Sequence, residues 1–280
     1  MFGKTCQIQL KDGNSASVFN QLTKKLGHRN SDGNTISWLM KQAEPAVQAV
    51  IAGTYENTKL EEISSGSNKI WAFCDEVDGM PRLYAKMKNL FLEELKAEVT
   101  FLEPDPVNEN ERKWFLENNL PMACGRFKES TLTTAMEISE FSHAINCVEE
   151  KLSNTEAIYN IFPKKGEVWA VFKDWNVNWT FHDYTRCTGY EMVEVVSDLC
   201  EQSGIRTVCL DRVGGIGTVF EKKKSKGGVV CKSFLRTELL QFSHRFSHRV
   251  PALKLKGEEL DGVLCELWKL DSAAVPLNLL

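Results

Sequence analysis

The chain has 280 residues, 42% of them hydrophobic and 26% charged, which is the composition of an ordinary globular protein with room for one large or two ordinary domains. Its formal net charge of −4 argues against a surface that binds polyanions throughout, so any contact with nucleic acid would come from a local patch. The first ten residues lack the apolar core of a signal peptide, and no apolar run approaches the ~18 residues that a membrane span needs.

The nine cysteines are scattered along the chain without a C-x-x-C pair. An odd number without paired spacing argues against a disulfide framework and against a zinc ribbon. We therefore expect free thiols that pack as small hydrophobic side chains in a reducing compartment.

Two short helices are predicted within residues 1–54. Gly27 suits the position after a helix end, Ser31 suits an N-cap, and Pro45 should bend or divide the second helix. Neither helix can bury its narrow apolar face alone, so we expect the pair to dimerise. The dimerisation candidates are Phe19, Leu22, Leu26, Ile36, Leu39 and Met40.

Several motifs in this segment occur in a specific order: VFNQLT (18–23), LGH (26–28), SDGNTI (31–36), WL (38–39) and QAEP (42–45). They resemble the helix-loop-helix half of class I TCP domains, which are plant transcription factors, over about residues 7–53. That family reads DNA largely with a basic segment before the first helix, and here QIQL (7–10) stands in its place. Phosphate contacts need basic side chains, and the DNA-contact candidates are Lys4 and Lys11. The resemblance therefore implies a dimerising helical pair more than an autonomous DNA reader.

A polar segment, residues 55–68, predicts a flexible linker. Beyond it, short apolar runs alternate with Gly, Pro and Asp turns, a pattern typical of many short strands. Two stretches of about a hundred residues then repeat the same landmarks, which indicates a duplicated unit. The landmarks are residues 70–73 with 168–171, 84–88 with 190–194, 99–102 with 207–210, 124–127 with 231–234, and 138–143 with 239–244.

These patterns predict an α+β fold that is mainly β. We expect a helix-loop-helix (1–54), the linker (55–68) and tandem small β-barrel-like units (69–145 and 146–280). Closing five or six short strands into a barrel removes free sheet edges and buries the inward-facing half of each strand. The Trp-Ala-aromatic opening, followed by a charged turn and a Tyr-containing strand, is similar by analogy to Tudor-like and BAH-like barrels.

The two units differ in their inserts. The first carries an acidic loop at residues 103–111, and the second carries a basic tip at residues 221–228. Two interpretations are open: both are solvated loops, or both steer a charged ligand toward the barrels.

Further motifs cover the chain from about residue 67 to its end: DGMP (78–81), CG (124–125), KKGEVWA (164–170), FSH (242–244), VP (250–251), GEELDG (257–262) and LDSAAVP (270–276). They resemble the domain of unknown function 3444, which lies C-terminal to a J domain in many plant DnaJ-type proteins. The His-Pro-Asp tripeptide of a J domain does not occur in the sequence, so the chain should not stimulate a chaperone ATPase. FSHRFSHR (242–249) shows twice an element that family members usually show once.

A search for catalytic and metal-binding motifs predicts a protein that is not an enzyme and holds no metal or cofactor. His244 and His248 are four residues apart, as in half of a zinc site, but tandem copying of the FSHR element explains the pair. The glycine-rich run 214–217 lacks both the Walker lysine and the G-x-G-x-x-G spacing, so it indicates a hairpin or bulge. No nucleophile elbow and no Cys-His context is present.

Aromatic residues near the first strand of each unit are the remaining functional signal. Beside an acidic turn, such rings can form a cage that holds a methylated ammonium by cation–π attraction. The alternative is that the rings are core, which we expect for Trp71 and Trp169 because they lie inside apolar runs. The cage candidates are Phe73, Tyr84, Phe172, Trp175, Trp179 and Tyr190, with Asp75, Asp78 and Asp174 as acidic neighbours.

We therefore expect a nuclear, non-enzymatic binding protein linked to transcription or chromatin. Its tandem β units would bind a protein or peptide, and its TCP-like head would serve association. The alternative is a DnaJ-type adaptor that lacks its J domain and acts in the cytoplasm or nucleus. Neither hypothesis involves a membrane.

Overall fold

The computed structural model describes residues 63, 69–152, 157–187, 189–212, 218–246, 267–270 and 274–275. All of them belong to one compact unit of the chain, residues 63–257 with 263–280. The predicted helix-loop-helix lies outside the described residues, together with its candidates Phe19, Leu22, Leu26, Ile36, Leu39, Met40, Lys4 and Lys11. No helix in the described part of the chain is long and apolar enough to cross a membrane.

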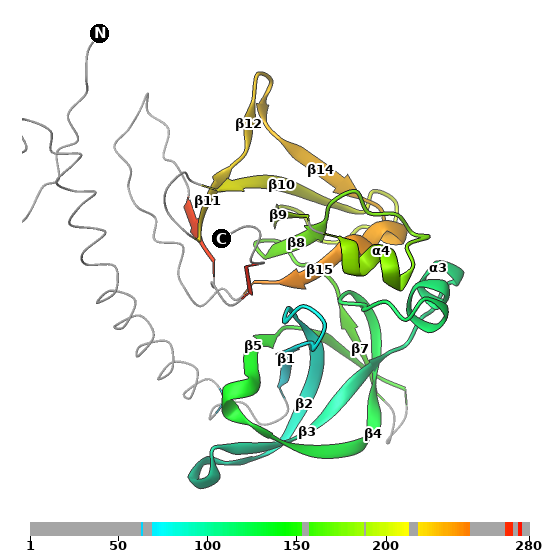
Figure 1. Ribbon diagram of the computed structural model, residues 1–280, viewed down its shortest axis with the longest axis vertical. Coiled ribbons are helices and arrows are strands. Elements are labelled where there is room, and N and C mark those ends of the chain that lie inside the picture. Colours follow the sequence, from blue (N-terminus) through cyan, green and yellow to red (C-terminus); the bar gives the residue numbers. More distant parts are fainter. Residues whose placement is uncertain are drawn as a thin grey trace, which may run out of the picture. The chain divides into compact units, whose positions relative to one another are not determined.

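Seven antiparallel strands form the first sheet in the order β5-β1-β2-β3-β4-β7-β6 (Figure 1). Its helical turns are η1 (Leu92–Glu94), α3 (Glu109–Arg112), the π-helical turn η2 (Lys113–Glu117) and η3 (Ile138–Glu140). Its strands are β1 (Ile70–Cys74), β2 (Pro81–Phe91), β3 (Lys96–Pro104), β4 (Gly125–Glu137), β5 (Phe141–Ile145), β6 (Val148–Lys151) and β7 (Ala157–Ile161).

The second sheet is also antiparallel and has the order β15-β8-β9-β10-β11-β16, with β14 paired to β10 beside β11. A two-stranded hairpin, β12 (Lys224–Ser225) with β13 (Gly228–Val229), projects from it. The helical turns are α4 (Phe181–Arg186) and η4 (Arg236–Gln241). The strands are β8 (Val168–Phe172), β9 (Tyr190–Val195), β10 (Ile205–Arg212), β11 (Val219–Lys222), β14 (Cys231–Phe234), β15 (Phe242–Arg245) and β16 (Leu267–Lys269).

The predicted mainly β architecture is confirmed, because the described helices are single short turns. Both sheets curl strongly (Figure 1). Among the described strands, the first and last strands of each order do not pair with each other. Strand pairing therefore does not close either sheet into a barrel. The first sheet includes β6 and β7, and it therefore extends to Ile161, beyond the boundary expected at residue 145.

The two sheets repeat one pattern. The order β5-β1-β2-β3-β4-β7 corresponds to β15-β8-β9-β10-β11-β16, and a 3-10 turn precedes both β5 and β15. The pairing of β1 with β5 shifts register between Trp71 and Phe73, and the pairing of β15 with β8 shifts at the matching place, between Phe242 and His244. A bulge at the same point of two pairings is a specific feature that a common ancestor explains.

Two landmarks of the sequence repeat need correction. Trp71 pairs with Ala85 and Trp169 pairs with Val193, so the structural equivalent of Tyr84 is Met192, two residues beyond Tyr190. A slip of two residues leaves the same faces inward, and the sequence pattern does not detect it.

The second correction concerns residues 124–127 and 231–234. Phe127 opposite Pro104 corresponds to Phe220 opposite Arg212, because the first half of β4 is equivalent to β11. The second half of β4 is equivalent to β14, where Phe234 lies opposite Ile205. The continuous strand β4 is therefore divided in the second sheet by the β12–β13 hairpin.

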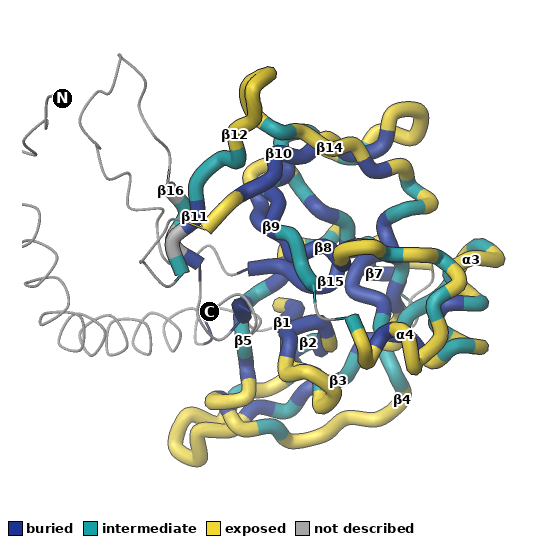
Figure 2. The backbone as a smooth tube through the Cα atoms, turned by 45° about the horizontal axis from the view of Figure 1, so that its top comes forward, coloured by how far each residue is buried: buried dark blue, intermediate teal, exposed yellow. Residues whose placement is uncertain are grey.

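Burial explains why the opening strands are apolar throughout. All five residues of β8, and the first four of β1, are buried, so both faces of these strands are covered (Figure 2). Trp71 meets Phe141 edge-on at 5.5 Å, and Trp169 meets Phe242 edge-on at 5.8 Å. The expectation that both tryptophans are core is correct.

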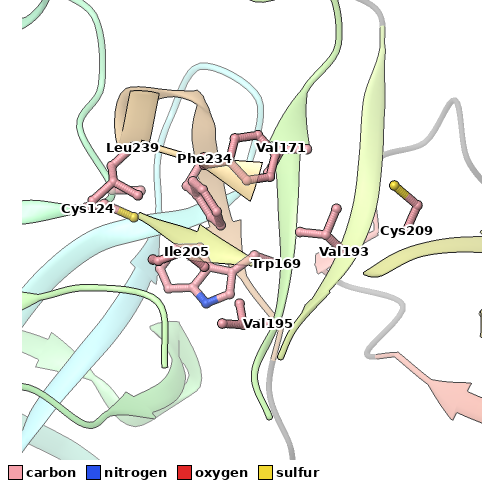
Figure 3. Packing of buried hydrophobic residues seen from close by; sticks show 11 residues of the cluster. Cys124, Trp169, Val171, Val193, Val195, Ile205, Cys209, Phe234 and Leu239 are labelled. Atoms are coloured by element: carbon pink, nitrogen blue, oxygen red, sulfur yellow. The ribbon is translucent and has the colours of Figure 1, made fainter. Parts of the chain in front are cut away.

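One hydrophobic cluster joins the two sheets. Ala123 and Cys124, just before β4, pack against side chains of the second sheet, among them Trp169, Phe234 and Leu239 (Figure 3). Burial raises the pKa of the Cys124 thiol well above its ordinary value, so this cysteine is a core residue in the neutral form.

Candidate functional site

Arg82 binds the acidic turn between β1 and β2. The sequence predicted this turn as one wall of an aromatic cage. The turn between β1 and β2 is held by Asp75, whose Oδ1 accepts the backbone N–H groups of Val77 and Asp78 at 3.1 Å each. Arg82 lies at the start of β2 and is only 2% exposed. Its guanidinium donates to Asp75 at 2.8 Å and to Asp78 at 2.9 Å.

Residues of the second sheet complete the surroundings of this guanidinium. It donates to the Tyr184 hydroxyl and, at 3.0 Å, to Ser243 Oγ. Its central carbon lies 6.0 Å from the Phe172 ring centroid and 5.8 Å from that of Tyr184. The Tyr190 hydroxyl donates to Asp78 at 2.9 Å.

The Arg82 network contains the aromatic rings and carboxylates of a cation cage. The cation that they surround is the guanidinium of Arg82 itself. Of the nine predicted cage residues, the structure brings four together here: Phe172, Tyr190, Asp75 and Asp78. Despite burial, the adjacent Tyr184, Asp75 and Asp78 raise the pKa of Arg82, so it stays charged. The network therefore joins the sheets by an internal ion cluster.

The Arg82 network continues to the C-terminal part of the described chain. Ser243 Oγ lies 3.0 Å from His244 Nδ1, and His244 Nε2 donates to the Ala274 carbonyl at 2.8 Å. A histidine that donates through Nε2 accepts through Nδ1 when neutral, so the Ser243 hydroxyl donates to it. Burial, and then the charge of Arg82, lower the pKa of His244 to about 3. Both ring nitrogens are engaged, and His248, its predicted neighbour, lies outside the described residues.

The other cage candidates lie elsewhere. Tyr84 is 1% exposed and donates to the Ala123 carbonyl at 2.8 Å, and Phe73 packs on Phe101 and Phe141 in the first sheet. These two rings are core. Asp174 is exposed and has a positive φ of 52°.

Trp175 and Trp179 form a half-buried aromatic cluster with an insert of the first half of the chain. Trp114 lies 6.0 Å from Trp175 and 6.3 Å from Trp179, measured between ring centroids. Asn118 donates to the Trp179 carbonyl at 3.0 Å. The cluster thus packs the loop after β8 onto the turn after α3.

A second buried ion pair also links the sheets. Arg245 donates to Glu167 at 2.8 Å and to the Ala144 carbonyl, and the Trp169 indole donates to Glu167 at 3.0 Å. Sequence reasoning missed both arginines. The spacing of four residues between Asp78 and Arg82 was a local signal for that pair. Arg245 and Glu167 are 78 positions apart, so no local pattern relates them.

Part of the charge of the two inserts is paired within the chain. In the acidic loop, Asp105 bonds to Arg126 at 2.9 Å. At the basic tip, Lys223 bonds to Asp211 at 3.0 Å, and nearby in β14 Lys232 bonds to Glu191. This local pairing weakens any long-range field from the two inserts.

The second half of β4 presents an open strand edge. On one side β3 pairs with β4 over residues 127–129 and 133–137, with a bulge at residues 130–132 between them, but on the other side β7 pairs only with Gly125 through Lys128. Within the described residues no strand pairs with the outer side of residues 130–137, which we call the free edge. Figure 2 shows this stretch as exposed, and Leu132 in it is 77% exposed.

Exposed apolar side chains lie where the free edge ends. The turn between β2 and β3, residues 91–96, is the hairpin tip, and its large side chains Phe91, Leu92 and Leu95 are 47%, 50% and 58% exposed. Leu95 adopts a φ of 52°, which is unfavourable for a leucine. The Leu95 carbonyl accepts the Ile138 N–H at 2.9 Å, so the tip adjoins the end of β4.

Comparisons with known proteins give two similarities. A family model described as "Domain of unknown function (DUF3444)" matches residues 52–259. "Transcription factor TCP20" of Arabidopsis thaliana is 40% identical over 67 residues, which are 24% of this chain and 21% of that protein. The chain thus spans about a fifth of the length of this curated relative. No solved structure matches.

Proposed function

The chain belongs to the DUF3444 family of domains of unknown function, and we propose that its β-rich portion is a non-enzymatic protein-binding module. Its ligand is an extended segment of another protein, chromatin-associated in our hypothesis, which adds a strand to the free edge of β4. The module acts in the nucleus and is linked to transcription.

The free edge carries this proposal. An unpaired strand side exposes a row of N–H and C=O groups that readily pair with another chain, and natural sheets protect such edges with lysine, proline, short strands or β-bulges. The bulge at residues 130–132 covers only the start of the free edge and leaves residues 133–137 regular. Residues 130–136 (STLTTAM) contain no charged residue and no proline. Strand addition gives affinity through main-chain hydrogen bonds, and side chains give specificity.

The Arg82 network leads us to place binding on the edge instead of in the predicted cage. Its guanidinium already lies 6.0 Å from the Phe172 ring centroid and donates to both acidic side chains, Asp75 and Asp78. The curled sheets suit the analogy with Tudor-like and BAH-like barrels, which remains part of the hypothesis. Among the predicted cage rings, Trp175, Trp179 and Tyr190 are half-buried. Trp175 and Trp179 lie outside the Arg82 network, and a ligand role stays testable for them.

The similarity to a transcription factor over 24% of the chain supports the nuclear assignment. In this hypothesis the TCP-like head associates through its helical pair. DNA contact through Lys4 and Lys11 is not part of it, because the uncharged QIQL stands at residues 7–10 and phosphate contacts need basic side chains.

The second hypothesis is an adaptor of DnaJ-type co-chaperones. The exposed Phe91, Leu92 and Leu95 favour it, because a surface for unfolded clients must accept apolar segments. It predicts binding of many unrelated apolar peptides, whereas the first hypothesis predicts a defined set.

An array of extended peptides, including modified histone segments, tests the proposal with the full chain and two proline variants. Adjacent residues of a strand direct their N–H groups to opposite sides. Of Thr133→Pro and Thr134→Pro, one therefore removes a hydrogen bond to β3 and loses stability, and the other removes an outward N–H. We expect the more stable of the two variants to lose at least ten-fold in peptide affinity.

Matched variants define the controls. Leu116→Lys changes an exposed leucine of η2, away from the free edge, and it should bind as the unchanged chain does. Binding that survives both proline variants and is abolished by Trp175→Ala would replace the edge with the aromatic cluster. A chain that binds no extended peptide would contradict the proposal.

A further inference from the structure

We infer that the free edge of β4 selects an extended segment that is basic and apolar at its amino-terminal end, bound antiparallel to β4. This inference rests on the proposed function, since it names the ligand chemistry of the same edge. It is carried by four features: the strands beside the edge, the missing protection, the charge of the hairpin tip and its apolar side chains.

The fold itself shows what lies against this side of the sheet. β7 pairs antiparallel with Gly125 through Lys128 of β4, and β16 pairs antiparallel with β11, the equivalent strand. Both are extended segments added after the main strands. A ligand strand on residues 130–137 would continue the line of β7, and antiparallel pairing is the more stable arrangement per residue.

The equivalent part of the second sheet carries protection that residues 133–137 of the free edge lack. β14 has four residues and carries Lys232, two devices that limit strand addition. The regular part of the free edge is residues 133–137, because residues 130–132 form a bulge, and it offers about 17 Å of strand at ~3.3 Å per residue. That length pairs with about five residues of a peptide.

The charge at the end of the free edge selects a basic ligand. The hairpin tip and the residues beside it carry five carboxylates and one basic side chain, Lys96. Their local net charge of −4 equals the formal net charge of the whole chain. The carboxylates are Glu93, Glu94, Glu98, Glu137 and Glu140. At the other end of the edge Glu129 is already paired with Lys86 and Lys88, so the acidity is confined to the tip.

The apolar side chains at the same place supply an anchor. Phe91 lies opposite Lys96, which lies opposite Glu137, so the tip and the last residue of the free edge are neighbours across the sheet. Three large apolar side chains, each about half exposed, are unusual beside so many charges, and exposed apolar groups rimmed by polar residues mark interaction sites.

The direction of the ligand follows from the pairing. β4 runs toward the tip at Glu137, so an antiparallel strand begins at the tip and ends near Thr133. The residues that meet the carboxylates and the apolar anchor are therefore the first residues of the bound segment.

The test uses four synthetic eight-residue peptides and the full chain, with affinity read by fluorescence anisotropy. The first has Lys-Leu-Lys at its amino end followed by alternating Thr and Val. The second has glutamate in place of both lysines, the third has the first sequence reversed, and the fourth is the first with alternate backbone N-methylation. We expect the first to bind about ten-fold or more tighter than each of the others, and to weaken as salt is raised.

Chain variants assign the contacts. Glu93→Gln/Glu94→Gln should weaken binding of the first peptide about three-fold or more at low salt, whereas Glu117→Gln/Glu150→Gln, an exposed pair of glutamates elsewhere, should not. Leu95→Gly removes an anchor and relaxes the positive φ, so it should lose affinity without loss of thermal stability.

The outcomes separate the two proposals. If the glutamate or reversed peptide binds as tightly as the first, and N-methylation still abolishes binding, strand addition stands and the charge and direction inferred for the ligand are wrong. If N-methylation has no effect, the proposed function itself fails. A chain that sediments as a dimer, and becomes monomeric in the edge-blocking proline variant, would make a second copy the occupant and overturn the inference.

Discussion

The two sheets have the same strand order and the same bulge, but they differ at the strand that follows β3 and β10. In the first sheet β4 is continuous over 13 residues, whereas in the second the equivalent positions are divided between β11 and β14, with four residues each. The β12–β13 hairpin is inserted between them. The difference teaches that one insertion changes a long open edge into two short strands without altering the topology around it.

The largest expected effects test whether the two sheets are equivalent at their cores. Trp71 and Trp169 are at most 1% exposed and contact equivalent phenylalanines. Replacing either by Ala removes a large buried ring and leaves a cavity, so each change should lower the free energy of unfolding by about 3–5 kcal/mol. Urea titration measures both. If one variant lost less than half as much free energy of unfolding as the other, the two sheets would not share a core design.

The next effect tests whether the sheets are one cooperative unit. Arg82→Met leaves Asp75 and Asp78 without their buried partner, and breaking such a pair costs about 3 kcal/mol. Arg236→Met, which removes a surface pair with Glu201, should cost below about 1 kcal/mol. A single unfolding transition that shifts as a whole is expected for Arg82→Met. Two transitions, of which only one moves, would mean that the network does not couple the sheets.

Sequence reasoning reached the duplication because apolar runs with tryptophan mark strands that are covered on both faces. It did not fix the register, since a two-residue shift between Tyr84 and Tyr190 keeps every side chain on its face. It assembled four members of the Arg82 network but not the arginine itself. The burial of Arg82 depends on Ser243, 161 positions away, and no local pattern reports such a contact.

The free edge was equally hidden from the sequence. Whether a strand has an unpaired side depends on where later segments return, and β7 covers only the first half of β4. The sequence does show the relevant feature, because residues 130–136 (STLTTAM) carry no charged side chain. That signal has meaning only once the strand order is known.

A pH dependence should arise in the second sheet from His244. Its pKa is lowered to about 3 in the folded chain by burial and by Arg82, with Asp78 acting in the opposite direction, against 6.5 for an ordinary histidine. Between these values the unfolded chain binds a proton that the folded chain does not, so stability falls as the pH falls from about 6.5 toward 3. The slope from this group is at most ~1.4 kcal/mol per pH unit.

Urea titration at several pH values between 7 and 4 measures this slope. His244→Gln keeps a polar side chain and should make the dependence shallower, although it lowers stability at pH 7. An unchanged slope in the variant would assign the acid sensitivity to other groups.

The smallest effect on stability bears most directly on the comparison of the two edges. Leu132→Lys places on β4 the kind of residue that β14 carries as Lys232. Leu132 is 77% exposed, so the change should alter the free energy of unfolding by less than about 0.5 kcal/mol. If the free edge is the binding surface, the same change should reduce peptide affinity at least several-fold, because a lysine there opposes strand addition and repels a basic ligand. Leu116→Lys adds the same charge on η2, away from the free edge, and separates the two causes. Equal losses in both variants would indicate a general charge effect, whereas a loss confined to Leu132→Lys would assign binding to the open side of β4.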